Sequence, residues 1–328
     1  MVSRCSTVGT VRAARLHRFG EPLVIEEAPE PHPGPGEVLV ELEYAGVNPL
    51  DLWLSRGTVA GGTQPLPFIP GAEAVGRLES RWVAIRGAGI GVSRDGTYAE
   101  RVAAPLDAVV ELPPGADPVQ AAALPIAGGT AWALAHHVAR VTPEDRALVL
   151  GASGGVGCIL LQVLRNAGVR AWGQTGDPGK AGFIQEQGAE RALVAGAQGL
   201  AEAVAELRPT VVFDPLGDGF TPPAIAALEP YGRLVLFGVS AGATQELDLR
   251  TLYRKAITVL TYSGTIEPVE RVREATEAAL RELAAGRLRV PVEEVLPLER
   301  AAEAHRRIEE RRVRGKLVLR VRDAGGVA

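Results

Sequence analysis

A strand, a glycine-rich turn, a helix and a second strand follow one another within residues 146–173, and this stretch limits the possible folds most strongly. The apolar run Ala147–Leu150 suits a buried parallel strand, and the turn Gly151–Gly157 follows it directly. Apolar residues then recur at helical spacing up to a stop at Gly168, and a second apolar run, Val169–Trp172, comes next. This order predicts one right-handed βαβ unit.

The small residues of the turn point to an anion. They let the backbone approach a pyrophosphate closely, and the N-terminus of the following helix offers N–H groups and a partial positive charge. Read as G-x-G-x-x-G, the positions are Ala152, Gly154 and Gly157, with alanine in place of the first glycine. Because a strand precedes the turn and a helix follows, we predict a dinucleotide site; the alternative is a turn that only packs helix on sheet. The residues assigned to the site are Ala152, Ser153, Gly154, Gly155, Val156 and Gly157.

Composition excludes several classes of partner and location. The 328 residues carry a formal net charge of −4, which gives no electrostatic reason to expect nucleic acid or anionic lipid as a partner. No run of about 18 apolar residues occurs, so no membrane span is expected. The two cysteines, Cys5 and Cys158, exclude a disulfide framework, and the first ten residues lack the apolar core of a secretion signal. We therefore expect a cytoplasmic protein.

The chain divides into two regions of different pattern. Early runs that alternate apolar and polar residues, such as Glu37–Tyr44, are joined by glycine and proline turns and predict an antiparallel β domain. From the glycine turn onward, strand-like and helix-like runs alternate, which is typical of a doubly wound parallel sheet. The last runs, ending in Lys316–Val321, are expected to return to the first domain.

The ordered set of motifs resembles the medium-chain dehydrogenase/reductase superfamily and, within it, the zinc-independent quinone oxidoreductases, or ζ-crystallin-like enzymes. The matches fall in the family's order across residues 11–321. They are Gly46–Asp51, Pro70–Gly76, Gly96–Glu100, Gly151–Gly157, Gly232–Gly238 and Gly315–Leu319.

The resemblance implies an α/β fold, with a Rossmann doubly wound parallel sheet and a GroES-like β-rich catalytic domain made from both chain ends. We expect residues 1–121, completed by 288–328, to form the GroES-like domain, and residues 122–287 to form the Rossmann NADPH-binding domain. In this family the edge equivalent to Ile257–Tyr262 often pairs with its two-fold mate. An unpaired edge of that composition would promote aggregation, so a homodimer is expected.

The resemblance also bears on zinc. Zinc-dependent relatives place Cys and His where this chain has Asn48 and Pro49, and His where it has Ala72. None of the three can supply the thiolate or imidazole that Zn²⁺ requires. We therefore expect no zinc.

Without a metal, hydride transfer depends on positioning the nicotinamide and on stabilising the negative charge that develops on oxygen. The family's asparagine beside nicotinamide and substrate corresponds to Asn48; the alternative is an asparagine that only shapes the turn before Pro49. Asp51 is expected to cap the short helix or orient the loop rather than act as a base. Trp53 stands where many quinone reductases carry tyrosine, and a quinone can stack on its indole. These three are the catalytic candidates.

A proton donor is not evident. The related enoyl reductases usually carry a tyrosine acid two residues after the glycine matching Gly57, and this chain has Val59 there. Tyr98 and Tyr262 lie in strand-like runs and are expected in the core. This weakens an enoyl-thioester substrate, whereas the reduced oxygens of a quinone are easily protonated by solvent.

The cofactor depends on the end of the second strand of the βαβ unit. Enzymes selective for NAD place Asp or Glu there, whereas this chain has Thr175. Lys180 stands where similar quinone reductases keep a lysine near the 2′-phosphate, so NADPH is favoured over NADH. Asp177 either disfavours that phosphate or caps the helix before Lys180. Residues that match positions lining the nicotinamide in relatives are Thr130, Phe237, Gly238, Val239 and Ser240.

The function predicted from these observations is a zinc-free NADPH-dependent oxidoreductase that transfers hydride to a small-molecule quinone or activated enone. One alternative is an enoyl-thioester or polyketide-tailoring reductase. Another is a non-catalytic NADPH-binding protein.

Overall fold

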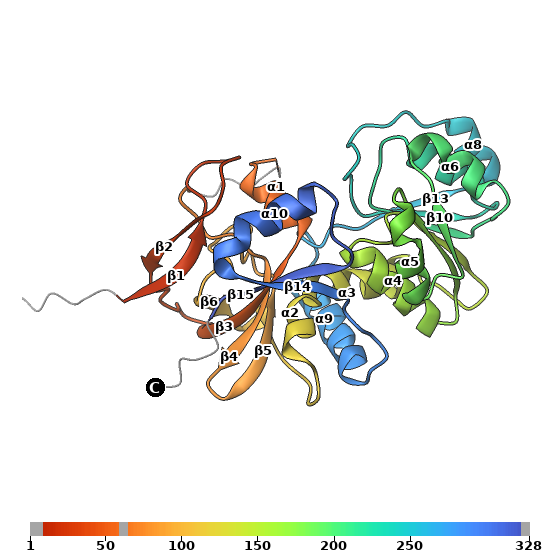
Figure 1. Ribbon diagram of the computed structural model, residues 1–328. Helices are drawn as coiled ribbons and strands as arrows, with labels where there is room; N and C mark the ends of the chain where they lie inside the picture. Colours follow the sequence, from red (N-terminus) through yellow and green to blue (C-terminus); the bar gives the residue numbers. More distant parts are fainter. Residues whose placement is uncertain (1–8, 59–64, 323–328) are drawn as a thin grey trace, which may run out of the picture. The chain divides into compact units, whose positions relative to one another are not determined.

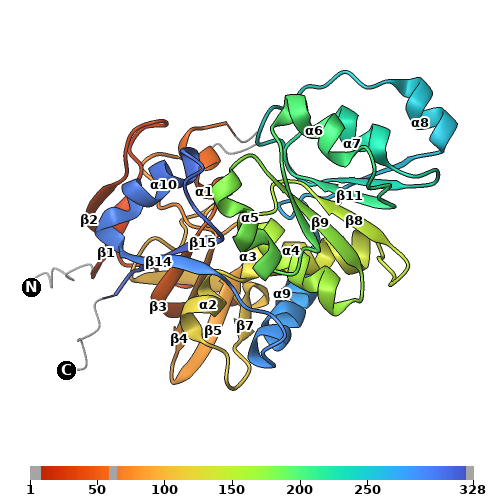
Figure 2. The ribbon, with the colours of Figure 1, turned by 45° about the vertical axis from the view of Figure 1, so that its right-hand side comes forward.

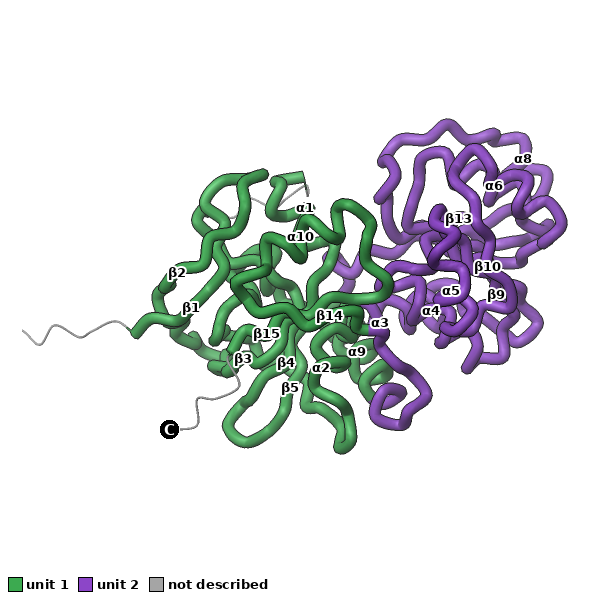
Figure 3. The backbone as a smooth tube through the Cα atoms, in the orientation of Figure 1, with its two compact units in different colours: residues 1–126, 268–280, 292–328 green, residues 127–267, 281–291 purple. Residues whose placement is uncertain are grey.

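The computed structural model describes residues 9–58 and 65–322 of the chain. Figure 3 shows its two compact units: unit 1 comprises residues 1–126, 268–280 and 292–328, and unit 2 comprises residues 127–267 and 281–291. The domain limits that the sequence predicts, after residues 121 and 287, stay a prediction. No helix in the described part of the chain is long and apolar enough to cross a membrane.

Unit 1 is built on a mixed sheet with the strand order β14-β15-β3-β4-β5-β7, to which β6 adds by pairing with β3; β1 and β2 pair separately. Its strands are β1 (Thr10–Arg15), β2 (Val24–Pro29), β3 (Glu37–Val47), β4 (Glu73–Leu78), β5 (Arg81–Arg86), β6 (Arg101–Pro105), β7 (Val109–Glu111), β14 (Val292–Pro297) and β15 (Lys316–Arg320). β15 pairs antiparallel with β3, with Leu317 opposite Val47. The last strand of the chain thus joins the sheet that the early strands form.

The helices of unit 1 cover this sheet and close its core. They are α1 (Pro49–Ser55), η1 (Leu106–Ala108), α2 (Pro118–Ala122), η4 (Leu298–Arg300), α10 (Ala301–Glu309) and the first part of α9 (Val269–Ala284). α1 and α10 contact each other and lie side by side in Figures 1 and 2. Alternate residues of β3, including Val40 and Leu42, enter a core shared with Leu317 and Leu319 of β15.

Unit 2 contains a six-stranded sheet in the order β10-β9-β8-β11-β12-β13, and every neighbouring pair is parallel. Its strands are β8 (Arg146–Val149), β9 (Arg170–Thr175), β10 (Arg191–Val194), β11 (Val211–Asp214), β12 (Arg233–Leu236) and β13 (Thr258–Thr261). Its helical segments are α3 (Pro125–Ala133), η2 (Leu134–Val138), α4 (Gly155–Asn166), η3 (Pro178–Lys180), α5 (Ala181–Glu186), α6 (Ala197–Val204), α7 (Thr221–Ala227) and α8 (Leu249–Lys255).

The strand order reverses at β8, as in a doubly wound sheet. α6 and α7 pack together against one face through a core that includes Leu148 and Leu200, and Figure 2 shows α4 and α5 on the other side of the strands. The predicted fold class, a Rossmann sheet plus a GroES-like β-rich domain, is confirmed.

Two local expectations differ from the structure. Tyr98, expected in a strand, lies before the start of β6, because Thr97 and Tyr98 donate their backbone N–H groups to carbonyls of Gly71 and Pro70 instead of a sheet neighbour. Tyr98 is fully buried, as expected of a core residue, whereas Tyr262 is only half-buried.

Candidate functional site

The glycine turn of unit 2 has the geometry of a backbone anion site. Gly151 has φ +59°, and its N–H donates to Gln174 Oε1 at 3.0 Å. The N–H of Ala152 donates to the backbone oxygen of Gln174 at 2.9 Å. Gly154 is the extended residue before α4, a 12-residue helix whose first N–H groups have no partner within the helix. The turn is therefore held from β9, and it leads into a helix N-terminus of the kind that favours anions.

Close packing explains why the residues here are small. A Cβ on Gly157 would lie 2.7 Å from both Ala152 Cα and Gly151 O, so only glycine lets α4 approach the turn this closely. Alanine replaces the first glycine of the motif because Gly173 of β9 leaves room for its methyl group. A Cβ on Gly173 would lie 2.9 Å from Ala152 Cβ and would overlap Ile184.

Thr175, Asp177 and Lys180 are brought together in one tight turn after β9. Thr175 Oγ1 accepts from Asp177 N at 3.2 Å. Asp177 Oδ1 accepts from Gly179 N at 2.9 Å, which caps η3. Lys180 ends η3 and is 8% exposed. Of the two roles considered for Asp177, capping is the one that the geometry displays.

The segment Phe237–Ser240 follows β12 and is tied to the loop after β11. Ser240 donates its N–H to Pro215 O at 3.0 Å, and a Cβ on Gly238 would lie 2.8 Å from the same oxygen. Val239 is 54% exposed. Thr130 is buried on α3.

Sequence reasoning missed two side chains that hold these loops. One is Gln174. The other is Asp214 at the end of β11, whose carboxylate accepts from the N–H groups of Leu216 (2.7 Å) and Gly217 (3.1 Å) and from Thr221 Oγ1 (2.7 Å). Burial raises the pKa of Asp214. The sequence feature that could have identified Asp214 is its place as the one acidic residue at the end of the apolar strand β11.

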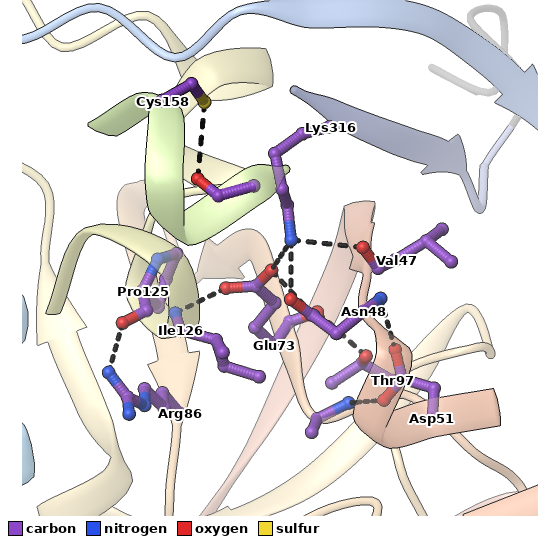
Figure 4. Close-up of polar contacts among 12 residues, drawn as sticks. Val47, Asn48, Asp51, Glu73, Arg86, Thr97, Pro125, Ile126, Cys158 and Lys316 are labelled. Atoms are coloured by element: carbon purple, nitrogen blue, oxygen red, sulfur yellow. Dashed lines mark hydrogen bonds and ion pairs between the residues drawn. The ribbon is translucent and has the colours of Figure 1, made fainter. Parts of the chain in front are cut away.

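Unit 1 contains a buried polar cluster, which we define as Asn48, Asp51, Glu73, Tyr98 and Lys316; none is more than 3% exposed. Figure 4 shows the neutral amide of Asn48 among the side chains of Lys316, Glu73 and Asp51. Lys316 Nζ donates to Asn48 Oδ1 at 2.6 Å, and Asn48 Nδ2 donates to Glu73 Oε1 at 2.8 Å. The side-chain amide of Asn48 is thus held at both ends.

The carboxylate of Asp51 holds the backbone before α1 in place by hydrogen bonds. Its Oδ2 accepts from Asn48 N at 2.8 Å and from Tyr98 OH at 3.1 Å, and its Oδ1 accepts from Ala72 N at 3.1 Å. Burial raises the pKa of Asp51 to about 7, against the hydrogen bond from Asn48. Burial and the neighbouring Asp51 raise the pKa of Tyr98 well above its usual value. The arrangement is that of a capping and orienting carboxylate.

Glu73 and Lys316 were noted only inside motifs. Gly46 makes room for Glu73, since a Cβ on Gly46 would overlap its carboxylate and lie 2.6 Å from Ala122 O. Lys316 opens the apolar strand β15 and is 3% exposed. A lysine is almost never buried without a partner, so its place at the head of an apolar strand was the signal.

Trp53 lies further along α1 and is half-buried. Its backbone oxygen accepts from the N–H and hydroxyl of Thr58, both at 3.0 Å. Within residues 9–58 and 65–322, no hydrogen bond joins Trp53 to the polar cluster. Val59, which replaces the tyrosine acid, lies outside the described residues.

Two family models match the chain. "Alcohol dehydrogenase GroES-like domain" matches residues 34–81, and "Zinc-binding dehydrogenase" matches residues 187–319. Asn48, Pro49 and Ala72 at the expected metal position do not fit zinc, because Asn48 Oδ1 accepts from the ammonium of Lys316 and the other two side chains carry no ligand atom. The described residues contain no group of three or more His, Cys, Asp or Glu that could hold a metal ion.

Curated proteins and solved structures resemble the chain over nearly its whole length. The quinone oxidoreductase of Sus scrofa is 30% identical over 325 residues, which cover 94% of this chain and 97% of that protein. A 2-haloacrylate reductase from Burkholderia is 27% identical, covering 94% and 98%. The quinone oxidoreductase of Thermus thermophilus, solved alone and with NADPH, is 32% identical with a TM-score of 0.83, covering 94% and 99%.

Proposed function

Because the chain belongs to the medium-chain dehydrogenase/reductase family and is an oxidoreductase, we propose that it reduces a quinone or an activated enone with NADPH and without zinc. One observation carries the cofactor assignment. The turn after β9 combines Thr175 with Lys180, while the carboxylate between them in the chain, that of Asp177, is engaged in capping η3. A ribose 2′-phosphate would find a cation and a hydroxyl there.

The chain's residues fit a nicotinamide dinucleotide as follows. Residues 152–157 would hold the pyrophosphate by backbone N–H groups at the start of α4. Thr175 and Lys180 would hold the 2′-phosphate, and Thr130 with residues 237–240 would line the nicotinamide. Bound NADPH supplies a hydride from its nicotinamide ring.

Asn48 is the proposed catalytic residue of unit 1. When hydride reaches an electron-poor carbon, negative charge develops on the conjugated oxygen, and a fixed N–H donor stabilises it. Asp51 holds the backbone of Asn48 in place, and Trp53 offers an apolar ring on which a quinone stacks. Solvent protonates the reduced quinone. The similarity to a 2-haloacrylate reductase supports an activated alkene as the second substrate class.

We also propose a homodimer through the strand Ile257–Tyr262, in which β13 lies at the edge of the parallel sheet. Among the described strands β13 pairs with β12 alone, and the neighbouring helix α8 has no buried residue. The large exposed side chains around this edge are Tyr231, Leu249, Tyr253, Val259 and Ile266. A copy of the chain added strand to strand would cover them. Light scattering on the wild type and Val259→Lys tests this pairing. The cytoplasmic location stays a prediction.

The test of the proposed function follows the loss of NADPH absorbance with phenanthrenequinone, a 2-haloacrylate and crotonyl-CoA as acceptors, with NADH in parallel. We expect turnover of the quinone or the haloacrylate and faster turnover with NADPH. Turnover of the thioester alone would assign the protein to the enoyl-thioester reductases. Tight NADPH binding without any turnover would make it a non-catalytic binding protein.

A further inference from the structure

The ammonium of Lys316 has all its hydrogens engaged. Nζ donates to Val47 O at 3.0 Å, to Asn48 Oδ1 at 2.6 Å and to Glu73 Oε1 at 2.8 Å. A lysine ammonium has three hydrogens and no acceptor, so each hydrogen has one partner. Lys316 therefore has no hydrogen left for a ligand, and its effect must pass through the groups it contacts.

Glu73 completes a ring of hydrogen bonds with Lys316 and Asn48. Its Oε1 accepts from both Lys316 and Asn48, and its Oε2 accepts from Ile126 N at 2.6 Å. Its side chain is 0% exposed, and that of Lys316 is 3% exposed. Desolvating two charges costs several kcal/mol per ion, and apolar replacements are often as stable. Fold stability alone is a poor reason for such a pair, which points to a role in orientation.

The pair determines which end of the Asn48 amide faces which charge. The oxygen faces the ammonium and the nitrogen faces the carboxylate. A flipped amide would put N–H groups against a cation and an oxygen against an anion, so the charges exclude the flipped state. One hydrogen of Nδ2 is donated to Glu73, and the other has no acceptor among the residues that the structure describes. Asn48 is thereby fixed as a donor.

We propose that Lys316 and Glu73 are positioning residues that hold the Asn48 amide as a hydrogen-bond donor to the substrate oxygen on which charge develops. This rests on the proposed function and narrows its substrate class to acceptors whose carbonyl or quinone oxygen becomes negative. The ammonium on Asn48 Oδ1 also polarises the amide, which strengthens the remaining N–H as a donor. The pair itself touches no substrate.

The first experiment is a kinetic cycle on the full-length protein. The test variant is Lys316→Met with Glu73→Gln, which leaves no unpaired buried charge, made with and without Asn48→Ala. With Asn48 present, we expect kcat to fall about 10- to 100-fold, with the Kd for NADPH unchanged. In the Asn48→Ala background, we expect the same two substitutions to change kcat less than about twofold. Equal losses in both backgrounds would overturn the proposal.

A matched control separates positioning from the loss of an ion pair. Arg170 and Glu190 form an exposed pair in unit 2, with Nη2 and Oε1 2.9 Å apart. We expect Arg170→Met with Glu190→Gln to keep wild-type kcat. An equal loss of kcat in this control would contradict a specific role for Lys316 and Glu73.

A second experiment does not need activity. The side-chain amide of Asn48 is followed by ¹⁵N NMR and identified by its loss in Asn48→Ala. We expect slow hydrogen exchange with solvent in the wild type and at least tenfold faster exchange in the Lys316→Met, Glu73→Gln protein. Unchanged exchange would refute the positioning role. A wild type with the expected exchange but no turnover would refute the proposed function and leave the positioning supported.

Discussion

The two candidate sites, one in each unit, are built in opposite ways. The turn Gly151–Gly157 of unit 2 is one continuous stretch of small residues that presents backbone N–H groups and carries no charged side chain. The polar cluster of unit 1 is made of side chains from distant positions, with Asn48 and Lys316 268 residues apart. The turn therefore depends on size and backbone approach, and the cluster depends on the balance of buried charges.

This contrast determines which substitutions each candidate site tolerates. An added methyl group damages the turn because its neighbours are backbone atoms, which cannot move aside cheaply. The cluster tolerates a change of volume better than the loss of one charge, since the remaining charge stays buried without its partner. Four predictions test the contrast, beginning with the largest expected effect.

Lys316→Met alone should destabilise the protein by about 3–5 kcal/mol, because it leaves the Glu73 carboxylate buried without its cation. Adding Glu73→Gln should recover most of that loss. Urea unfolding measures both variants against the wild type. A double variant as unstable as the single one would show that the lost charge balance is not the cause.

His305 of α10 should make unit 1 sensitive to acid. Burial and the nearby Arg56 lower its pKa from 6.5 to about 4, and its Nε2 has no hydrogen-bond partner among the described residues. Between these values the unfolded chain binds a proton that the folded chain does not, so stability falls by about 3 kcal/mol as the pH drops from 6.5 to 4.

Asp51 has the opposite effect on the pH dependence of stability, over a pH range that overlaps that of His305. Its raised pKa means that the folded chain holds a proton that the unfolded chain releases, so this group favours folding as the pH falls from about 7 to 4. We compare the free energy of unfolding of His305→Gln with that of the wild type at each pH. We expect the difference, variant minus wild type, to be more positive at about pH 4.5 than at about pH 7. Unfolding midpoints measured across this range check the sign, and an unchanged profile would contradict it.

Gly157→Ala should weaken NADPH binding by about tenfold or more and cost about 1–3 kcal/mol of stability, because the new Cβ meets backbone atoms at 2.7 Å. The matched control is Gly182→Ala in α5, where nothing lies within 4 Å of the added Cβ. Calorimetric titration with NADPH measures both. Equal affinities in the two variants would mean that close packing at the turn is unimportant for binding.

The smallest expected effect is on cofactor selectivity. Asp177→Ser keeps a capping oxygen and removes a negative charge beside the proposed phosphate site. We expect the ratio of NADPH to NADH affinity to rise about three- to tenfold. Asp117→Ser, which changes the corresponding cap of α2 in unit 1, should leave the ratio unchanged. A shift in the control instead would remove the electrostatic explanation.

The sequence predicted what is encoded locally. The strand, turn and helix at Ala147–Leu164 have a periodicity that needs no distant partner, and so does the alternation that defines the parallel sheet. Asn48 and Asp51 were singled out through a short motif, and the capping role expected of Asp51 agrees with its hydrogen bond to Asn48 N. Whether Asn48, Asp51 and Trp53 act in catalysis stays a prediction.

The parts of the site that the sequence did not predict depend on contacts between residues far apart in the chain. Lys316 meets Glu73 only because β15 pairs with β3 and β3 pairs with β4. The departure at Ala152 likewise has its explanation on another strand, at Gly173. Pairing between distant strands decides such contacts, so periodicity and spacing gave no basis for predicting them.

The distance along the chain between Glu73 and Lys316 also determines which parts of the protein are synthesised first. The two residues are 243 positions apart, and ribosomes add about 5–20 residues per second, so about 12–50 s pass between the carboxylate and its ammonium. The seven residues of the glycine turn are translated within about a second of one another at the same rates. A nascent chain therefore carries a complete turn well before Asn48 can be oriented. A chain whose translation stops before residue 316 would contain the glycine turn and Asn48, but it would lack the ammonium that is proposed to orient the Asn48 amide.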